Sequence, residues 1–319
     1  MEFNHKNSKV ETGKTAYTVD FYERRARLLL DWCERTHNLQ WQADAALACR
    51  LIVGGRWDKL SRATKRLYRA SLISFMMDAG EGDAVAYMQN IDSSVDGPER
   101  EPRVKREKRL THDDMSRIIK HLDIANSEID RMVLRLLYSG LITGLRPGEW
   151  RTATFEYESG VGILTVRNSK NTHGRAHGDF RTLILSDLDD AQGGVIADLV
   201  RRSSEKTEAE YKSIIDRVID RLGGITKRIW PLAKSRPSLY SARHQFAADA
   251  KKAGMDRVTL AALMGHASTG TAARYYGIKR DGGSGHGVTV TAIPEDKARV
   301  ILAEARNRSA SSNDPGAHF

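Results

Sequence analysis

The chain has 319 residues, enough for two domains that each bury a core, and its 51 lysines and arginines outnumber its 41 aspartates and glutamates. The resulting charge of +10 favours a polyanionic partner, nucleic acid ahead of an acidic membrane surface, although solubility alone also accounts for it. No apolar run has the length of a membrane span, and the polar N-terminus lacks the apolar core of a secretory signal. The two cysteines lie in apolar helical patterns, which favours buried thiols in a reducing cytosol over a disulfide or a zinc site.

The first part of the chain is predicted to be a small helical bundle behind a polar arm. Residues 1–17 are expected to be mobile, and apolar residues recur at helical spacing through residues 18–92. The second of four helices is expected to end at the Gly54-Gly55 pair, because glycine disfavours a helix interior. The third helix carries a basic face that either lies against a phosphate backbone or is an ordinary solvated surface. Its residues are Arg62, Lys65, Arg66 and Arg69.

A basic segment with almost no apolar content, residues 93–110, marks the clearest domain boundary. Five of the seven residues at 103–109 are basic, which suits a flexible linker that follows phosphates between two nucleic-acid-binding domains. A plain solvated tether is the alternative. The basic residues are Arg103, Lys105, Arg106, Lys108 and Arg109.

Residues 111–280 are predicted to form a second domain that combines helices with a small sheet. Thr111 opens the first helix with capping-box spacing, and the apolar run at residues 129–141 indicates a buried helix. Residues 162–166 and 180–185 change to the period of strands, and a polar hairpin joins them. The fold class is therefore mainly α with a small antiparallel β-sheet, an α+β arrangement.

Helices return in the last third of the chain. They are predicted at residues 188–202 and 209–222, and residues 238–277 are typical of three short amphipathic helices. Residues 281–319 are expected to supply a C-terminal tether, a short strand, a helix and a disordered end.

Five motifs occur along the second domain in a fixed order. Thr143-Gly-Leu-Arg146-Pro-Gly-Glu149 resembles the first arginine box of the tyrosine recombinases, the phage integrase family, and Lys170 resembles the family's hairpin lysine. Tyr240-Ser-Ala-Arg243-His244 resembles the second arginine box, and Leu263-Met-Gly-His266 resembles the third box. Tyr275 stands nine residues after His266, the spacing of the family's nucleophile. The resemblance covers about residues 111–277, whereas residues 18–92 resemble only the family's upstream SAM-like, DNA-binding domain.

The matched residue types suit cleavage of a phosphodiester by a tyrosine. The transition state gathers negative charge on the non-bridging oxygens, and the guanidinium groups of Arg146 and Arg243 can stabilise that charge. Lys170 can protonate the leaving 5′ oxygen, and His266 can donate a further hydrogen bond to the phosphate. We expect Glu149 to orient Arg146, although a simple ion pair between the two is the alternative.

Two of these assignments have competing neighbours. On the hairpin, His173 or Arg175 is the alternative to Lys170 as the residue that contacts DNA. At the nucleophile, Tyr275 and Tyr276 cannot both face the site, because adjacent helical residues diverge by about 100 degrees. The spacing favours Tyr275, which makes Tyr276 a packing or DNA-backbone residue.

Tyr240 departs from the family pattern, which most often has histidine at that position. Histidine can accept the nucleophile's proton near neutral pH, whereas tyrosine is a donor and a poor base there. Either Tyr240 keeps only the phosphate contact, or His244, one residue beyond the arginine, takes a larger part. Slow turnover or dependence on an accessory factor would follow.

The resemblance implies a site-specific recombinase or integrase that cuts and rejoins DNA through a 3′-phosphotyrosine, for a mobile element, without a cofactor or a metal. Implied partners are double-stranded DNA, other protomers in a tetrameric synapse, and accessory DNA-bending or directionality proteins, in the cytoplasm at a bacterial nucleoid. The C-terminal segment would dock on a neighbouring protomer or on its own domain. The alternatives are a topoisomerase or telomere resolvase with the same chemistry, and a DNA-binding regulator on a decayed recombinase scaffold.

Overall fold

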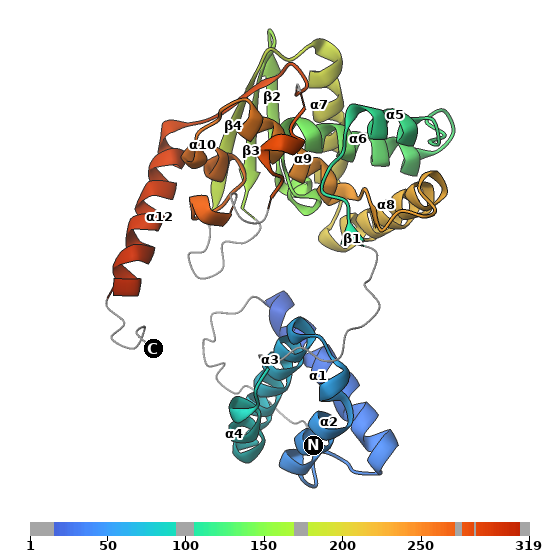
Figure 1. Ribbon diagram of the computed structural model, residues 1–319, viewed down its shortest axis with the longest axis vertical. Coiled ribbons are helices and arrows are strands. Elements are labelled where there is room, and N and C mark those ends of the chain that lie inside the picture. Colours follow the sequence, from blue (N-terminus) through green and yellow to red (C-terminus); the bar gives the residue numbers. More distant parts are fainter. Residues whose placement is uncertain (1–15, 94–104, 169–177, 272–275, 284, 313–319) are drawn as a thin grey trace, which may run out of the picture. The chain divides into compact units, whose positions relative to one another are not determined.

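The computed structural model describes residues 16–93, 105–168, 178–271, 276–283 and 285–312. The chain divides into two compact units, Met1–Arg103 and Val104–Phe319 (Figure 1). Both units are largely helical, and the second also contains a small antiparallel sheet, so the predicted fold class is confirmed.

Four helices, joined by short turns, form the part of the first unit that the structure describes. They are α1 (Ala16–His37), α2 (Ala45–Arg56), α3 (Arg62–Ala79) and α4 (Gly82–Asn90), with a 3-10 turn η1 (Trp57–Lys59) after α2. Their apolar faces meet in one core, in which both cysteines are buried as expected. The core residues with no exposed surface include Cys33, Cys49, Ile52, Leu72 and Met88.

The glycine pair of α2 does not end the helix, which corrects the expectation from the sequence. The helix begins after Asp44, whose side chain caps the Leu47 N–H, and it continues through Gly54 and Gly55 to Arg56. A Cβ atom at Gly55 would lie 2.7 Å from a ring carbon of Trp32 in α1. Glycine is therefore used here for the close approach of two helices and not as a helix stop.

The second unit contains the remaining elements. They are β1 (Lys105–Arg106), α5 (His112–Ile119), α6 (Glu128–Thr143), η2 (Pro147–Thr152), β2 (Thr154–Glu158), β3 (Val161–Arg167), β4 (Phe180–Ser186), α7 (Asp190–Ser204), α8 (Glu208–Ile229), β5 (Ser235–Arg236), α9 (Leu239–Lys252), α10 (Arg257–Leu263), η4 (Lys279–Asp281), β6 (Thr289–Ala292) and α12 (Pro294–Ser312). The predicted strands at residues 162–166 and 180–185 are present, as are the predicted helices up to α10, whereas the third short helix expected within residues 238–277 lies partly outside the described residues. The sequence had not indicated β1, β2 or β5. The capping box at Thr111 is also confirmed.

The main sheet is antiparallel throughout and has the strand order β2-β3-β4-β6. The paired residues Leu164 and Leu183 lie opposite each other on its buried face. Along β4, burial alternates so that Arg181, Leu183 and Leu185 share that face. The charged side chain of Arg181 therefore lies on the same buried face as two leucines.

The end of the predicted linker belongs to the second unit. Residues 105–106 form β1, which pairs in parallel with β5. Leu110 is buried, and its N–H donates to Oε1 of Gln245 in α9 at 3.0 Å. Of the predicted basic residues there, Lys108 and Arg109 are exposed, and Arg103 lies outside the described residues.

The segment after the nucleophile region is packed against α9, so the expectation of a flexible tether is wrong for its described residues. Lys251 Nζ donates to the Gly277 carbonyl at 2.7 Å, and Lys252 Nζ donates to the Gly282 carbonyl at 2.9 Å. Glycine permits this packing, because a Cβ at Gly277 would lie 2.3 Å from the His244 carbonyl oxygen.

The C-terminal elements dock on their own unit. Strand β6 extends the sheet beside β4, and Asp296 accepts a hydrogen bond from the Thr182 N–H at 2.7 Å. Helix α12 then runs away from the sheet next to α10 (Figure 1). It continues to Ser312, so residues 309–312 are helical, where a disordered end was expected. No helix in the described part of the chain has the length and apolar character needed to cross a bilayer.

Candidate active site

The first arginine box lies at the turn between α6 and η2. Gly144 ends α6 in the left-handed region with φ of 69°, and a Cβ there would lie 2.3 Å from a Phe246 ring carbon. The chain then extends through Arg146 and enters η2. Glu149 holds Arg146 twice: its Oε2 accepts from the Arg146 N–H at 2.8 Å, and its Oε1 accepts from Nη1 at 2.6 Å. The ion pair considered as an alternative is therefore present.

Arg243 reaches this turn from α9 and is completely buried. Its Nη1 donates to the Gly144 carbonyl at 2.5 Å, and its Nη2 donates to the Met264 carbonyl at 2.6 Å. The same Nη2 lies 3.1 Å from Nε2 of His266. One guanidinium group thus joins the first arginine box to the third box, two segments that are distant in sequence.

A third arginine, which the sequence analysis missed, completes the cluster. Arg181 extends from β4, and its Nη2 donates to Oε2 of Glu149 at 2.8 Å. Its Nη1 donates to Oδ1 of Asn168 at 2.6 Å, and its Nε donates to the Leu263 carbonyl at 2.8 Å. The available signal was its alternation with Leu183, which places Arg181 on the buried face of the strand.

Positive charge exceeds negative charge within this cluster, because three guanidinium groups surround the single carboxylate of Glu149. Burial alone would raise the pKa of Glu149, but Arg181, Arg146 and Arg243 hold it well below its usual range. Burial, and then repulsion from Arg146, lowers the pKa of Arg243 to about 10, so this residue stays charged at neutral pH. A buried excess of positive charge is suited to an anion.

His266 is neutral in this environment. Burial, and then the charges of Arg243 and Arg146, lower its pKa to about 2. Since Arg243 Nη2 is always a donor, His266 Nε2 must accept, and the ring proton lies on Nδ1. That Nδ1 and Nε of Arg243 are buried without a hydrogen-bond partner among the described residues. Both are unsatisfied donors of the kind that a phosphate oxygen accepts.

Tyr276 lies over the same cluster. Its ring centroid is 5.0 Å from Cζ of Arg243, 5.1 Å from the His266 ring and 5.0 Å from the His244 ring. Burial, and then the nearby charge of Lys108, lower the pKa of His244 to about 4, so His244 is also neutral at pH 7. The described residues thus bring Arg146, Arg243 and His266 together beside a tyrosine.

Comparisons with known proteins show the family of the chain. Residues 108–280 match the model of the phage integrase family. The chain belongs to this family, the tyrosine recombinases. No curated protein matches the chain.

Solved structures resemble this integrase-family chain in fold. The Tn1549 transposon integrase in complex with a circular intermediate DNA shares 16% identity at a TM-score of 0.50, over 83% of this chain and 91% of that one. The XerH site-specific recombinase bound to difH substrate shares 18% identity at a TM-score of 0.42, over 72% of this chain and 65% of that one. The chain thus spans slightly less than two thirds of the XerH chain. At 16% identity, the likeness to the Tn1549 integrase concerns the fold alone.

Several predicted site residues lie outside the described residues. They are Lys170, His173, Arg175 and Tyr275. Tyr240, the irregular member of the second box, is 37% exposed. It lines a cavity of about 400 Å³ together with Pro147 and Ile219. Its predicted role at the phosphate stays a prediction.

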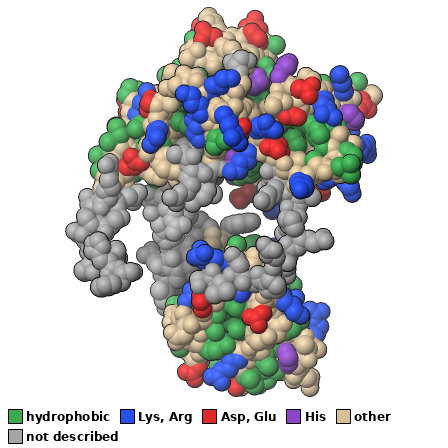
Figure 2. Space-filling model, viewed as in Figure 1, with side chains coloured by type: hydrophobic (Ala, Val, Ile, Leu, Met, Phe, Trp, Pro, Cys, Tyr) green, Lys and Arg blue, Asp and Glu red, His purple; other side chains and the backbone are tan. Residues whose placement is uncertain are grey.

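Only two of the four residues of the predicted basic face of α3 are exposed to solvent. Lys65 is 4% exposed, which corrects its expected position on an open face. Arg69 donates to the carbonyls of Met88 and Gln89 at the end of α4, whereas Arg62 and Arg66 are exposed. Figure 2 shows lysine and arginine side chains scattered over the visible surface, with acidic side chains between them.

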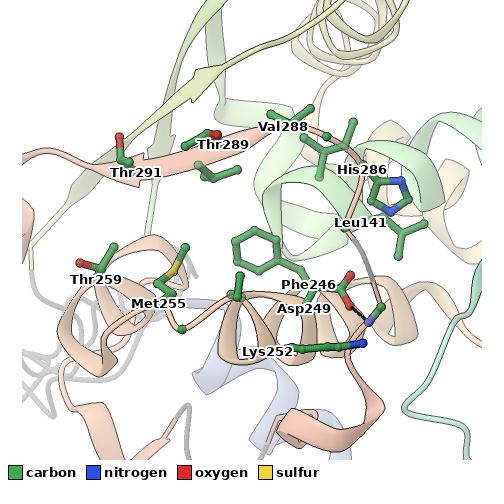
Figure 3. Close-up of a pocket in the computed structure, with 18 of the residues that line it drawn as sticks. Leu141, Phe246, Asp249, Lys252, Met255, Thr259, His286, Val288, Thr289 and Thr291 are labelled. Atoms are coloured by element: carbon green, nitrogen blue, oxygen red, sulfur yellow. Dashed lines mark hydrogen bonds between the residues drawn. The ribbon is translucent and has the colours of Figure 1, made fainter.

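A cavity of the second unit is separate from the arginine cluster. It has a volume of about 740 Å³ and lies between α9 and the segment that leads into β6. Phe246, Met255 and Val288 line it, and Gly283 N–H donates to Asp249 at its rim at 2.6 Å (Figure 3). Of the predicted catalytic residues that the structure describes, none lines this cavity. Among the described residues, no group of three His, Cys, Asp or Glu is placed to hold a metal.

Proposed function

We propose that the chain is a site-specific DNA recombinase that cuts and rejoins strands through a 3′-phosphotyrosine. The observation that carries this proposal is the convergence of Arg146, Arg243 and His266 in one buried, positively charged cluster. The cluster presents unpartnered donors of the kind that a phosphate oxygen accepts. Double-stranded DNA is the proposed partner, in line with the related transposon integrase, which was solved with DNA.

In the proposed reaction the hydroxyl oxygen of Tyr275 attacks phosphorus, and the bond from phosphorus to the 5′ oxygen breaks. The tyrosine hydroxyl releases its proton to water, and Lys170 gives one to the leaving oxygen. Arg146 and Arg243 stabilise the charge on the non-bridging oxygens, and His266 donates through Nδ1. Because the phosphotyrosine retains the energy of the broken linkage, the 5′ hydroxyl of a second strand can reverse the step without a nucleotide cofactor.

The nucleophile is the assignment with a specific competitor. Spacing favours Tyr275, whereas the ring of Tyr276 lies beside Arg243 and His266. We propose that Tyr275 attacks and that Tyr276 packs over the cluster.

The test begins with DNA trapped covalently on the protein in expressing cells and recovered under denaturing conditions. Sequencing this DNA gives the cleavage site, and a duplex nicked beside the scissile phosphate then accumulates the covalent adduct. We expect Tyr275→Phe to abolish the adduct and leave DNA binding intact, and Tyr276→Phe to retain it. The opposite result would assign the nucleophile to Tyr276. Tight DNA binding by the wild type with no adduct would favour a regulator.

We further propose that four protomers act on two sites for a mobile element. A single duplex that is relaxed or closed into a hairpin would instead indicate a topoisomerase or a resolvase. Products that join strands from two duplexes would support recombination. Adduct formation is expected to be unchanged in EDTA, because guanidinium and imidazole groups supply the proposed charge stabilisation.

A further inference from the structure

We propose that Arg181 is a positioning residue for strand cleavage, which holds Arg146 and the turn before His266 in register. The inference rests on the proposed function and names a residue outside the five recombinase motifs. Arg181 has no exposed surface, and all three of its guanidinium nitrogens make hydrogen bonds. Its partners belong to three separate segments, each of which leads to a proposed catalytic residue.

The first segment is the arginine box. Oε2 of Glu149 accepts both the Arg146 N–H and Arg181 Nη2, each at 2.8 Å. Oε1 of the same carboxylate accepts Arg146 Nη1 at 2.6 Å. The carboxylate therefore cannot rotate without breaking its bond to Arg181, and the direction of the Arg146 side chain depends on that orientation.

The second segment is the turn that carries His266. Arg181 Nε donates to the Leu263 carbonyl at 2.8 Å, where α10 ends. Gly265 follows with φ of 63°, and a Cβ there would lie 2.7 Å from Asn168 Oδ1 and 2.8 Å from Arg181 Nη1. The backbone of the turn thus packs directly on the Arg181–Asn168 pair, which fixes the position of the following histidine.

The third segment is the base of the β3–β4 hairpin. Asn168 accepts from Arg181 Nη1 at 2.6 Å and donates through Nδ2 to the Gly178 carbonyl at 2.8 Å. One planar group therefore bonds in fixed directions to two side chains, Glu149 and Asn168, and to one backbone carbonyl, that of Leu263. Lysine cannot replace it, because an ammonium group on a flexible stem does not have this fork geometry.

The experiment measures single-turnover adduct formation on the nicked duplex, with DNA affinity measured separately. Arg181→Lys retains the charge but loses the fork, and we expect cleavage to fall about 100-fold, the scale of a misplacement near 1 Å. DNA affinity should stay within about threefold of the wild type. Asn168→Ala leaves both Glu149 contacts in place, so it should fold, and it should slow cleavage by about tenfold.

A matched control separates positioning from simple stability. Arg221 makes a two-armed ion pair with buried Asp130, at 2.6 and 2.7 Å, in the same unit. At a temperature where Arg221→Lys and Arg181→Lys are equally folded, only Arg181→Lys should lose cleavage. Equal losses in the two variants would indicate a structural role and overturn the inference.

A double-mutant cycle tests the route through Glu149. If Arg181 acts through this carboxylate, Arg181→Lys combined with Glu149→Gln should cleave at most about tenfold more slowly than the slower single variant. A double variant whose loss of cleavage rate equals the product of the two single losses would show that Arg181 does not act through Glu149. Wild-type protein without any adduct would refute the proposed function itself, whereas an active wild type with a fully active Arg181→Lys variant would refute only this inference.

Discussion

Replacing Glu149 by glutamine removes the one negative charge that three arginines share. The carboxylate lies 2.6 Å from Arg146, 2.8 Å from Arg181 and 4.0 Å from Arg243, and its side chain has no exposed surface. Removing one partner of a buried ion pair costs about 3–5 kcal/mol. For a unit of this size each kcal/mol shifts the melting temperature by about 2–4 °C, so we expect Tm to fall by about 10 °C.

Asp130→Asn is the control for this change. Asp130 is equally buried but pairs with a single arginine, Arg221, whose side chain is 31% exposed. Its loss should cost about 1.5–3 kcal/mol, as for a hydrogen bond to a charged group. Because Glu149→Gln leaves the cluster with a larger positive excess, phosphate should restore its Tm more than that of Asp130→Asn.

Scanning calorimetry of both variants, in chloride and in phosphate at equal ionic strength, measures the two effects. A Glu149→Gln variant that melts with the wild type would refute the reasoning about the cluster. Equal gains of both variants in phosphate would show only the general stabilisation by an excluded anion.

Further outcomes follow from other parts of the structure. The pKa values of His244 and His266 are lowered on folding, so the unfolded chain takes up protons first as the pH falls below about 6.5. The free energy of unfolding should drop by about 1–2 kcal/mol per histidine between pH 6.5 and 5. Denaturant titrations at several pH values measure this drop, which should be smaller in each His→Gln variant. Tyr240→His should retain or raise the adduct rate, by up to about 100-fold for a well-placed base, and loss of cleavage with normal DNA binding would contradict this. In α2, a Cβ at Gly54 would have open space, so Gly54→Ala should stabilise the bundle by up to about 1 kcal/mol. Gly55→Ala should destabilise the bundle, because its Cβ would clash with the Trp32 ring. Urea unfolding midpoints that shift in the same direction for both variants would refute this distinction.

The sequence predicted the elements that local chemistry controls. The capping box at Thr111 and the strand period of residues 180–185 were both recognisable, since neighbouring residues determine them. The errors arose where tertiary packing decides the outcome. Gly55 remains helical because of a tryptophan from another helix, and the segment around Gly277 is ordered by lysines of α9.

The site shows the same division. The motif spacing indicated Arg146, Arg243 and His266, and the structure brings all three together. The motif spacing did not indicate Arg181. An arginine in an alternating strand is usually assigned to the solvent-facing side, and only its two-residue spacing from Leu183 places it on the buried side. Its partners Asn168 and the Leu263 carbonyl are distant in sequence, so no local pattern could reveal them.

The pairing of β6 with β4 sets a practical limit on shortened versions of this protein. The family match ends at residue 280, before β6 begins, so a fragment cut there would retain every recombinase motif. It would nevertheless lose the strand that pairs with residues 183–186 and the carboxylate of Asp296 that caps the Thr182 N–H. An apolar strand with an uncovered edge recruits other chains, so such a fragment would tend to precipitate. A useful catalytic fragment must therefore extend through β6 into α12.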